Sequence, residues 1–328
     1  MTQRTMVEAI NNTLQREMAR DERIILFGQD VGVNGGVFRA TDGLIDRFGP
    51  ARVVDTPLAE ALILGTAVGL AAAGLVPLPE IQFLGFSYQA FHQLAGQISR
   101  LRFRSNGRFE GPITVRAPFG GGVRTPELHS EALEGQLANI PGLKIVMPAS
   151  ARDAAGLLTS AIRDPDPVLF LEPLRGYRSL RDDLPDDEDI IEPLGQARLV
   201  QDGQDLVIVA WSYQVEIARR AAVLLAEEGH SVAVLDLRSL VPLDVASLAA
   251  VVARCGRVVV AEEGAHTGSF GGEVVATLVE ECFYDLEAPV LRVSGYDVPY
   301  PMGLLEDRYV PSVGRLVAGC RRVLEMAP

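Results

Sequence analysis

A single carboxylate, Glu60, lies in an otherwise apolar segment that follows Asp55-Thr56-Pro57. Thr56 can cap a helix and Pro57 suits a first helical position, so the sequence predicts a helix from here to about Gly74. With Thr56 as the cap, the glutamate of a capping box would stand at position 59, which is alanine. Two explanations of Glu60 remain open: interaction with the helix dipole, or a buried carboxyl that keeps its proton and hydrogen-bonds a ring nitrogen.

The histidine with the most suggestive surroundings is His129, which follows Gly120-Gly121-Gly122 and precedes Ser130. Ser130 could cap a helix running toward Leu137, and a histidine at a helix N-terminus is disfavoured as the imidazolium. His129 could therefore carry a proton beside a cleft, although a structural role is the alternative. The glycine run fits neither GxxxxGK[ST] nor GxGxxG, so it gives only a weak indication of phosphate binding.

The elements that must position these side chains alternate between strand and helix, which predicts a mainly parallel sheet. In the predicted helix that contains Glu60, Gly65, Gly69 and Ala73 form a stripe of small residues that would allow close packing on a sheet or a partner helix. The predicted helices are 6–18, 56–74, 88–99 and 151–163, and the predicted strands are 23–28, 76–83, 113–116, 144–147 and 168–171.

The segment RDDLPDDEDIIE, residues 181–192, is the best candidate for a linker, because it contains seven acidic residues and a proline. A solvated loop is favoured there over an acidic docking patch. We expect domain one to span 1–183, the linker 184–200 and a smaller domain 201–328. The second domain is predicted to contain strands at 205–211, 231–237, 257–262 and 289–294, with helices at 215–228, 244–254 and 272–283.

Composition excludes several classes of protein. A chain of 328 residues exceeds the size of a usual single core, and 48% apolar with 22% charged residues is typical of a globular protein. The net charge of −13 argues against nucleic acid as a partner. The longest apolar run, 61–76, is too short to span a membrane. Three scattered cysteines and an acidic N-terminal segment favour a reducing cytoplasm.

Nine sequence blocks, spread over nearly the whole chain, resemble the β subunits of 2-oxo acid dehydrogenase E1 components. The resemblance implies an α/β protein of two three-layer domains with mainly parallel sheets: the pyrimidine-binding domain of thiamine diphosphate enzymes and a transketolase C-terminal-like domain. The blocks are GQDVG (28–32), GGVFRAT (35–41), DTPLAE (55–60), EIQF (80–83), RFRSNG (102–107), PGLKIVMP (141–148), LDLRSLVPLD (235–244), EECFYDLEAPV (280–290) and GYDVPYP (295–301).

The resemblance also assigns roles to residues. It implies that Glu60 hydrogen-bonds N1′ of the aminopyrimidine ring of thiamine diphosphate, and that Leu58 and Phe86 pack against that ring. His129 matches the histidine implicated in acyl transfer to lipoamide. Gln29 stands where glutamate is common, and Glu131 stands where glutamine is usual. Residues Ile113, Ala161, Ile162, Asp164 and Asp166 match a structural potassium site, which relies largely on main-chain carbonyls.

The motif that holds Mg²⁺ and the diphosphate, which begins GDG, is absent from the chain. In the family this half of the site lies on an α subunit. The resemblance therefore implies an α₂β₂ heterotetramer, with a lipoyl-bearing E2 and its subunit-binding domain as further partners.

The expected activity is oxidative decarboxylation of a branched-chain 2-oxo acid of the 2-oxoisovalerate type. Branched-chain enzymes often have tyrosine where this chain has Phe86. A pyruvate or acetoin dehydrogenase is the first alternative, because most substrate contacts come from the α chain. A catalytically silent structural or E2-docking subunit is the second alternative. A complete transketolase-like enzyme in one chain is disfavoured by the missing diphosphate motif.

Overall fold

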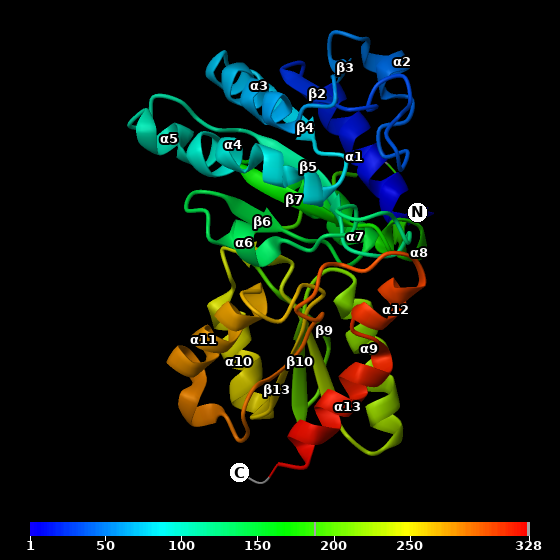
Figure 1. Ribbon diagram of the computed structural model, residues 1–328, viewed down its shortest axis with the longest axis vertical. Helices are drawn as coiled ribbons and strands as arrows, with labels where there is room; N and C mark the ends of the chain where they lie inside the picture. Colours follow the sequence, from blue (N-terminus) through cyan, green and yellow to red (C-terminus); the bar gives the residue numbers. More distant parts are fainter. Residues whose placement is uncertain (187, 327–328) are drawn as a thin grey trace.

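Alternating strands and helices build two sheets, one above the other, in the computed structural model, which describes residues 1–186 and 188–326 (Figure 1). The first sheet has seven strands in the order β12-β6-β7-β5-β4-β2-β3. All neighbouring strands in it are parallel except β12 and β6. Its strands are β2 (Ile24–Gly28), β3 (Val53–Asp55), β4 (Val76–Glu80), β5 (Thr114–Phe119), β6 (Lys144–Val146), β7 (Val168–Pro173) and β12 (Ser239–Val241).

Helices cover both faces of this sheet, as the strand pattern requires. Leu26 packs in the core beneath α1 (Met6–Arg20) and α7 (Ala151–Ile162), whereas the next residue, Phe27, packs on the opposite side with α3 (Glu60–Ala72) and α4 (Phe91–Gly96). Alternate side chains of a strand point to opposite faces, so two apolar cores result. Shorter elements are α2 (Leu44–Phe48), α5 (Leu101–Arg104), α6 (Glu134–Ala138), α8 (Gly176–Ser179), η1 (Leu84–Ala90) and η2 (Ile98–Arg100).

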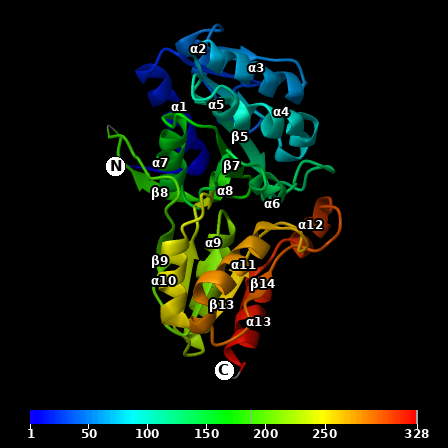
Figure 2. The ribbon, with the colours of Figure 1, turned by 90° about the vertical axis from the view of Figure 1, so that its left-hand side faces the viewer.

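The second sheet has the order β14-β13-β10-β11-β9 and is parallel apart from β9. Helices α9 and α13 pack on one face and α10 and α11 on the other, as the turned view in Figure 2 also shows. The elements are β9 (Arg198–Gln201), β10 (Leu206–Ala210), β11 (Val232–Asp236), β13 (Val258–Ala261), β14 (Leu291–Val293), α9 (Gln214–Glu227), α10 (Val245–Cys255), α11 (Phe270–Cys282), η3 (Phe283–Asp285), η4 (Gly303–Leu305), α12 (Glu306–Tyr309) and α13 (Val313–Leu324).

The two layered units share a continuous apolar core. Ile140 and Leu143 of the first unit belong to the same buried cluster as Trp211 and Phe270 of the second. Strand β12 follows β11 in the chain but pairs with β6 of the first sheet. The predicted two-domain α/β architecture with mainly parallel sheets is confirmed, and the units are joined by strand pairing as well as by side-chain packing.

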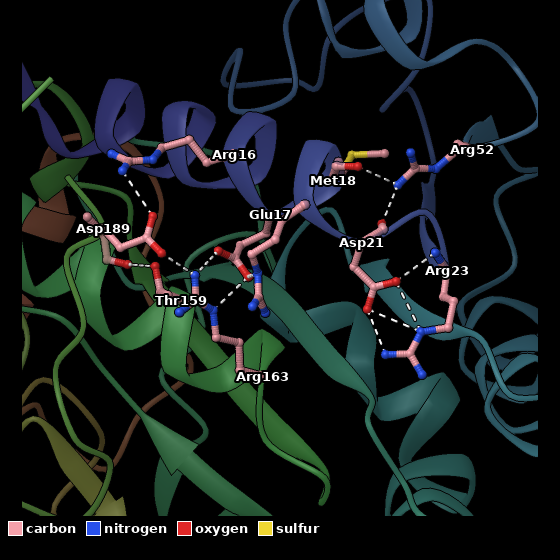
Figure 3. Close-up of polar contacts among 11 residues, drawn as sticks. Arg16, Glu17, Met18, Asp21, Arg23, Arg52, Thr159, Arg163 and Asp189 are labelled. Atoms are coloured by element: carbon pink, nitrogen blue, oxygen red, sulfur yellow. Dashed lines mark hydrogen bonds and ion pairs between the residues drawn. The ribbon is translucent and has the colours of Figure 1, made fainter. Parts of the chain in front are cut away.

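The acidic segment is more ordered than a solvated linker. Its first residues form β8 (Arg181–Leu184), antiparallel to β1 (Thr2–Thr5), and the predicted linker overlaps β8 and β9 at its two ends. Asp189 lies 2.6 Å from Arg163, the residue that follows α7, and Arg163 also binds Glu17 of α1 (Figure 3). Asp187 lies outside the described residues. Because these carboxylates bind arginines of the same chain, the segment fastens domain one instead of forming a free docking patch.

The predicted helix 88–99 is broken into η1, α4 and η2. Helix α4 ends at Gly96, and Gln97 leaves the helical conformation with φ −123°. Within the described residues no helix is both long and apolar enough to cross a membrane. The three cysteines are free and buried.

Candidate active site

The predicted site residues follow four neighbouring parallel strands of the first sheet. Gln29 follows β2, Glu60 follows β3, Phe86 follows β4 and His129 follows β5. These strands are adjacent in the order β3-β2-β4-β5. Parallel strands direct their carboxyl ends to one edge of a sheet, which is where open α/β proteins bind ligands. The fold therefore brings the four positions to the same edge.

The predicted start of the helix that carries Glu60 is wrong. Helix α3 begins at Glu60 itself, with Ala59 as N-cap and no side-chain cap. Pro57 disfavours a helical backbone at the preceding Thr56, whose N–H instead donates to the carbonyl of Gly28 at 2.9 Å. Residues 56–59 thus form a connection that leaves Leu58 63% exposed and makes Glu60 the first helical residue.

Two polar atoms of this connection are buried without a partner. Glu60 is only 4% exposed, and its Oε2 has no hydrogen bond within the described residues. The Oγ1 of Thr56 is likewise buried and unbonded there. A buried polar atom that lacks its hydrogen bond destabilises the folded protein by about 1–3 kcal/mol. A helix dipole favours a carboxylate at Glu60 but does not explain its burial. A polar ligand bound at this connection could hydrogen-bond both the Glu60 carboxyl and the Thr56 hydroxyl.

The loop that carries Gln29 is fixed beside this connection. Asp55 accepts hydrogen bonds from the N–H groups of Gly32 at 2.6 Å and Val33 at 3.0 Å. A Cβ on Gly28 would lie 2.7 Å from the carbonyl oxygen of Glu80, so only glycine allows β2 and β4 to end this close together. Gln29 is half-buried in this loop. Gln29 thus lies at the carboxyl edge of the sheet, and its contribution to a cofactor site stays a prediction.

His129 lies in an aromatic cluster. Its ring centroid is 4.6 Å from that of Phe83 and 4.9 Å from that of Phe86. Nδ1 lies 2.9 Å from the carbonyl oxygen of Glu127, which can only accept, so Nδ1 carries a proton and Nε2 is the nitrogen left for chemistry. Phe83 was not singled out by sequence, although it ends the EIQF block.

The predicted helix cap beside His129 is wrong. Helix α6 starts at Glu134 with Leu133 as N-cap, and the Ser130 hydroxyl is 2.7 Å from that of Thr125. His129 therefore lies in a loop and not at a helix N-terminus. The loop packs closely on η1, since a Cβ on Gly85 would lie 1.9 Å from the carbonyl oxygen of Leu128.

A half-buried carboxyl group, that of Glu131, lies two residues from His129. Burial, followed by the nearby Glu127 carboxylate, raises the pKa of Glu131 above its ordinary value. The raised pKa shifts Glu131 toward its neutral form. At any given pH the neutral fraction of Glu131 is therefore larger than that of an ordinary glutamate.

A buried ion-pair network lies in the strands that carry the site. Arg116 of β5 donates to Glu172 of β7 at 2.7 and 3.0 Å and to Glu80 of β4 at 2.7 Å, and Tyr177 also donates to Glu172. Burial raises the pKa of Glu80, and the neighbouring Glu172 raises it further, while Arg116 opposes the shift. Sequence patterns did not identify this network, because its members are far apart in the chain.

The acidic side chains at the predicted potassium site form ion pairs within the chain, and the site itself, which relies largely on main-chain carbonyls, stays a prediction. Both carboxylate oxygens of Asp164 lie 2.7 Å from the Lys144 ammonium, and Asp166 pairs with Arg102. The carbonyl of Ile113 accepts from Val168, and that of Ala161 accepts from Thr114; Ile162 lies beside them in α7. Within the described residues no group of three His, Cys, Asp or Glu could hold a metal ion.

Comparison with known proteins gives matches along the chain. A family described as the transketolase pyrimidine binding domain matches residues 2–179, and one described as the transketolase C-terminal domain matches residues 195–316. A pyruvate dehydrogenase E1 component subunit beta from Staphylococcus epidermidis is 47% identical over 325 residues, covering 99% of this chain and all of the relative. The corresponding subunit from Staphylococcus aureus is 46% identical over the same length.

A solved structure described as "Split gene transketolase, inactive beta4 tetramer" has a TM-score of 0.80 and covers 99% of each chain. It is 23% identical to this chain and so supports the fold alone.

Proposed function

Because the chain belongs to the β subunits of 2-oxo acid dehydrogenase E1 components, which have the transketolase-like fold of thiamine-dependent enzymes, we propose that it supplies the pyrimidine half of a thiamine diphosphate site that acts on pyruvate. In this proposal Glu60 hydrogen-bonds the cofactor ring, and His129 assists transfer of the acyl group to a lipoyl-bearing E2.

The observation that carries this proposal is Oε2 of Glu60, which has no hydrogen-bond partner in the described part of the chain. It is a buried acidic oxygen at the carboxyl edge of a parallel sheet, and a ring nitrogen would satisfy it. The Thr56 hydroxyl offers a second polar contact, and Phe86 and Leu58 offer apolar surface to the same ring. When bound, thiamine diphosphate supplies the carbanion chemistry that decarboxylates a 2-oxo acid.

His129 is proposed to assist the second half of the reaction. The sulfur–sulfur bond of the lipoyl group breaks, one sulfur bonds to the acyl carbon, and the other sulfur takes a proton. The electron pair for this reduction comes from the decarboxylated substrate. In the imidazolium form His129 carries a proton on Nε2 as well as on Nδ1, which donates to the Glu127 carbonyl, and we propose that Nε2 delivers its proton to that sulfur.

Pyruvate replaces the branched-chain substrate that the sequence blocks favoured. The relatives at 46–47% identity are named as pyruvate dehydrogenase subunits. Phe86, where branched-chain enzymes often have tyrosine, agrees with this choice.

An E1 α subunit is the proposed partner, and we assign Mg²⁺ and the diphosphate to it because this chain has no GDG motif. Exposed apolar side chains lie on the segments that carry the half-site, with Leu58 63%, Leu62 55% and Tyr88 47% exposed. Within the predicted small-residue stripe, a Cβ on Gly65 would lie 3.7 Å from the Gln93 side chain of α4, whereas a Cβ on Gly69 would meet no atom of the described residues within 4 Å. Exposed apolar residues on neighbouring elements such as α3 and η1 are consistent with a protein interface.

Reconstitution tests the proposal. The chain alone should show no decarboxylation, and addition of an E1 α subunit, thiamine diphosphate and Mg²⁺ should give activity with pyruvate above 2-oxobutyrate, 2-oxoisovalerate and 4-methyl-2-oxopentanoate. A higher kcat/KM for 2-oxoisovalerate than for pyruvate would support the branched-chain assignment instead. An inactive but stable assembly would favour the structural-subunit alternative.

A further inference from the structure

The glycine run at 120–122 binds carboxylates of its own chain. The N–H of Gly121 donates to Oε1 of Glu263 at 2.6 Å, and the N–H of Gly122 donates to Oε1 of Glu306 at 2.7 Å. The N–H of Arg124 donates to the other oxygen of Glu306 at 3.1 Å. Successive main-chain N–H groups form an anion-binding concavity, and here two side chains of the second domain fill it.

The contact requires glycine. A Cβ on Gly121 would lie 2.4 Å from Oη of Tyr300, and a Cβ on Gly120 would lie 2.8 Å from Oε1 of Glu263. Gly122 has φ +133°, and a Cβ there would lie 2.7 Å from Cα of Arg175. The close approach of the second domain thus explains Gly120 and Gly121, and the backbone of Arg175 in the first domain explains Gly122.

Both carboxylates come from rigid, buried positions. Glu263 follows β13, is 8% exposed and also accepts a 2.6 Å hydrogen bond from Tyr300. Glu306 begins α12 and is 1% exposed, and the Arg175 guanidinium lies 3.7 Å from it. In Figure 1, α12 lies at the upper end of the lower domain, just below α8. Helix α8 begins at Gly176, the residue after Arg175.

The residues that bind these carboxylates belong to the loop 120–131, which contains His129. This 120–131 loop is closed by a hydrogen bond from the N–H of Gly120 to the carbonyl of Glu131 at 3.3 Å. Non-glycine residues Arg124 and Leu128 have positive φ, which surrounding contacts must maintain. The loop forms neither helix nor strand, so its position depends on its contacts with Glu263 and Glu306 at one end and with η1 at the other.

We propose that Glu263 and Glu306 are positioning residues: the second domain uses them to hold the 120–131 loop, and with it His129, in the geometry needed for acyl transfer. The inference rests on the proposed role of His129. It assigns to the second domain a part in the second half-reaction and none in decarboxylation.

The test separates the two half-reactions in E1 assembled with its α subunit and thiamine diphosphate. Decarboxylation of pyruvate is followed with ferricyanide as electron acceptor, and acyl transfer is followed with a free lipoyl domain. Glu306→Gln keeps the size of the side chain but loses one of two acceptor oxygens. It should lower kcat for transfer about tenfold, with KM for the lipoyl domain and the ferricyanide rate within about twofold of wild type.

Companion variants make the result specific. Glu263→Gln should act in the same direction, and Glu306→Asp, which keeps both oxygens, should recover part of the rate. Gly121→Ala disturbs the contact with Glu263 from the side of the loop. It replaces a glutamate variant in the test if that variant does not fold. Glu227→Gln, at an exposed position at the end of α9, is the matched control and should behave as wild type.

Wild-type transfer in Glu306→Gln and Glu263→Gln would overturn the inference, and so would an equal loss of both half-reactions, which indicates a merely structural role. His129→Ala distinguishes the two proposals. If His129→Ala transfers acyl groups normally, the proposed function of His129 fails. If His129→Ala is slow while both glutamine variants are normal, only the positioning role fails.

Discussion

Glu60 leads to the most direct prediction at the scale of a single residue. Glu60→Gln keeps the shape of the side chain but cannot exchange a proton with a cofactor ring. We expect decarboxylation by the assembled enzyme to fall by about 10²- to 10⁴-fold, the usual contribution of a positioned acid or base. Thermal midpoint and assembly should be unchanged, since Oε2 makes no bond within the described residues. Activity within tenfold of wild type would contradict the assigned role.

Glu134 gives a second prediction at this scale, through the single tryptophan of the chain. Burial, with the Glu262 and Glu263 carboxylates nearby, raises the pKa of Glu134 to about 7. Trp211 Nε1 donates to its Oε1 at 3.3 Å. Tryptophan fluorescence should therefore titrate near pH 7 in the wild-type protein. Glu134→Gln, which mimics the neutral acid, should abolish that transition; its persistence would assign the titration to another group.

The same pKa fixes the sign of a stability change. The folded-state value, about 7, is above the ordinary 4.5, so the folded protein binds this proton more tightly than the unfolded chain. The contribution of Glu134 is complete below pH 4.5 and is lost as pH rises through about 7. Relative to wild type, Glu134→Gln should gain stability between pH 5 and 8, by on the order of 3 kcal/mol at most. Chemical denaturation at several pH values measures the difference.

At the scale of secondary-structure elements, the Arg116 network joins β4, β5 and β7 beneath the site. Arg116→Met would leave Glu80 and Glu172 buried without their cation, which should cost about 3–5 kcal/mol. Arg23→Met is the matched control, because the Arg23–Asp21 pair is exposed and such pairs contribute little. Denaturant unfolding of both variants provides the comparison. Equal effects would show that the network does not stabilise the sheet.

Elements also show what sequence could and could not predict. Long periodic segments such as α1 and α7 were placed within two residues, because their apolar spacing and caps agree with the fold. The start of α3 was missed by four residues, since Pro57 suits a helix and an extended connection equally well. The cap at Ser130 failed because its hydroxyl bonds Thr125 inside an irregular loop. Capping and turn patterns in the sequence do not show which of these alternatives the packed structure will select.

For the site, chemistry-bearing residues were identified by motif, whereas their supports were not. Glu60 and His129 belong to short blocks of sequence, but Glu306 reaches Gly122 across 184 positions. Contacts at this separation leave no periodic pattern. The glycine run was the one available signal, and it indicated an anion without showing that the anion belongs to the chain itself.

At the scale of the whole molecule, α3 connects the half-site to the expected assembly. The helix is apolar on nearly all sides, yet Leu62 and Gly69 are exposed in the single chain. Gly69→Leu should stabilise the isolated chain by up to about 1 kcal/mol, because glycine disfavours a helix and no atom lies within 4 Å of the added Cβ. The same substitution should prevent close approach of an α subunit.

Gly314→Leu is the control for this assembly experiment, because Gly314 is an exposed glycine in α13 of the second domain. Thermal midpoints of the isolated chains and light scattering of the mixtures with α subunit separate folding from association. We expect Gly69→Leu to fold and fail to form α₂β₂, while Gly314→Leu folds and assembles. Normal assembly of Gly69→Leu would remove this face of α3 from the interface. In that case the exposed Leu58 and Tyr88 surface would have to meet the α subunit without the helix, and the shared site would require a different approach of the two chains.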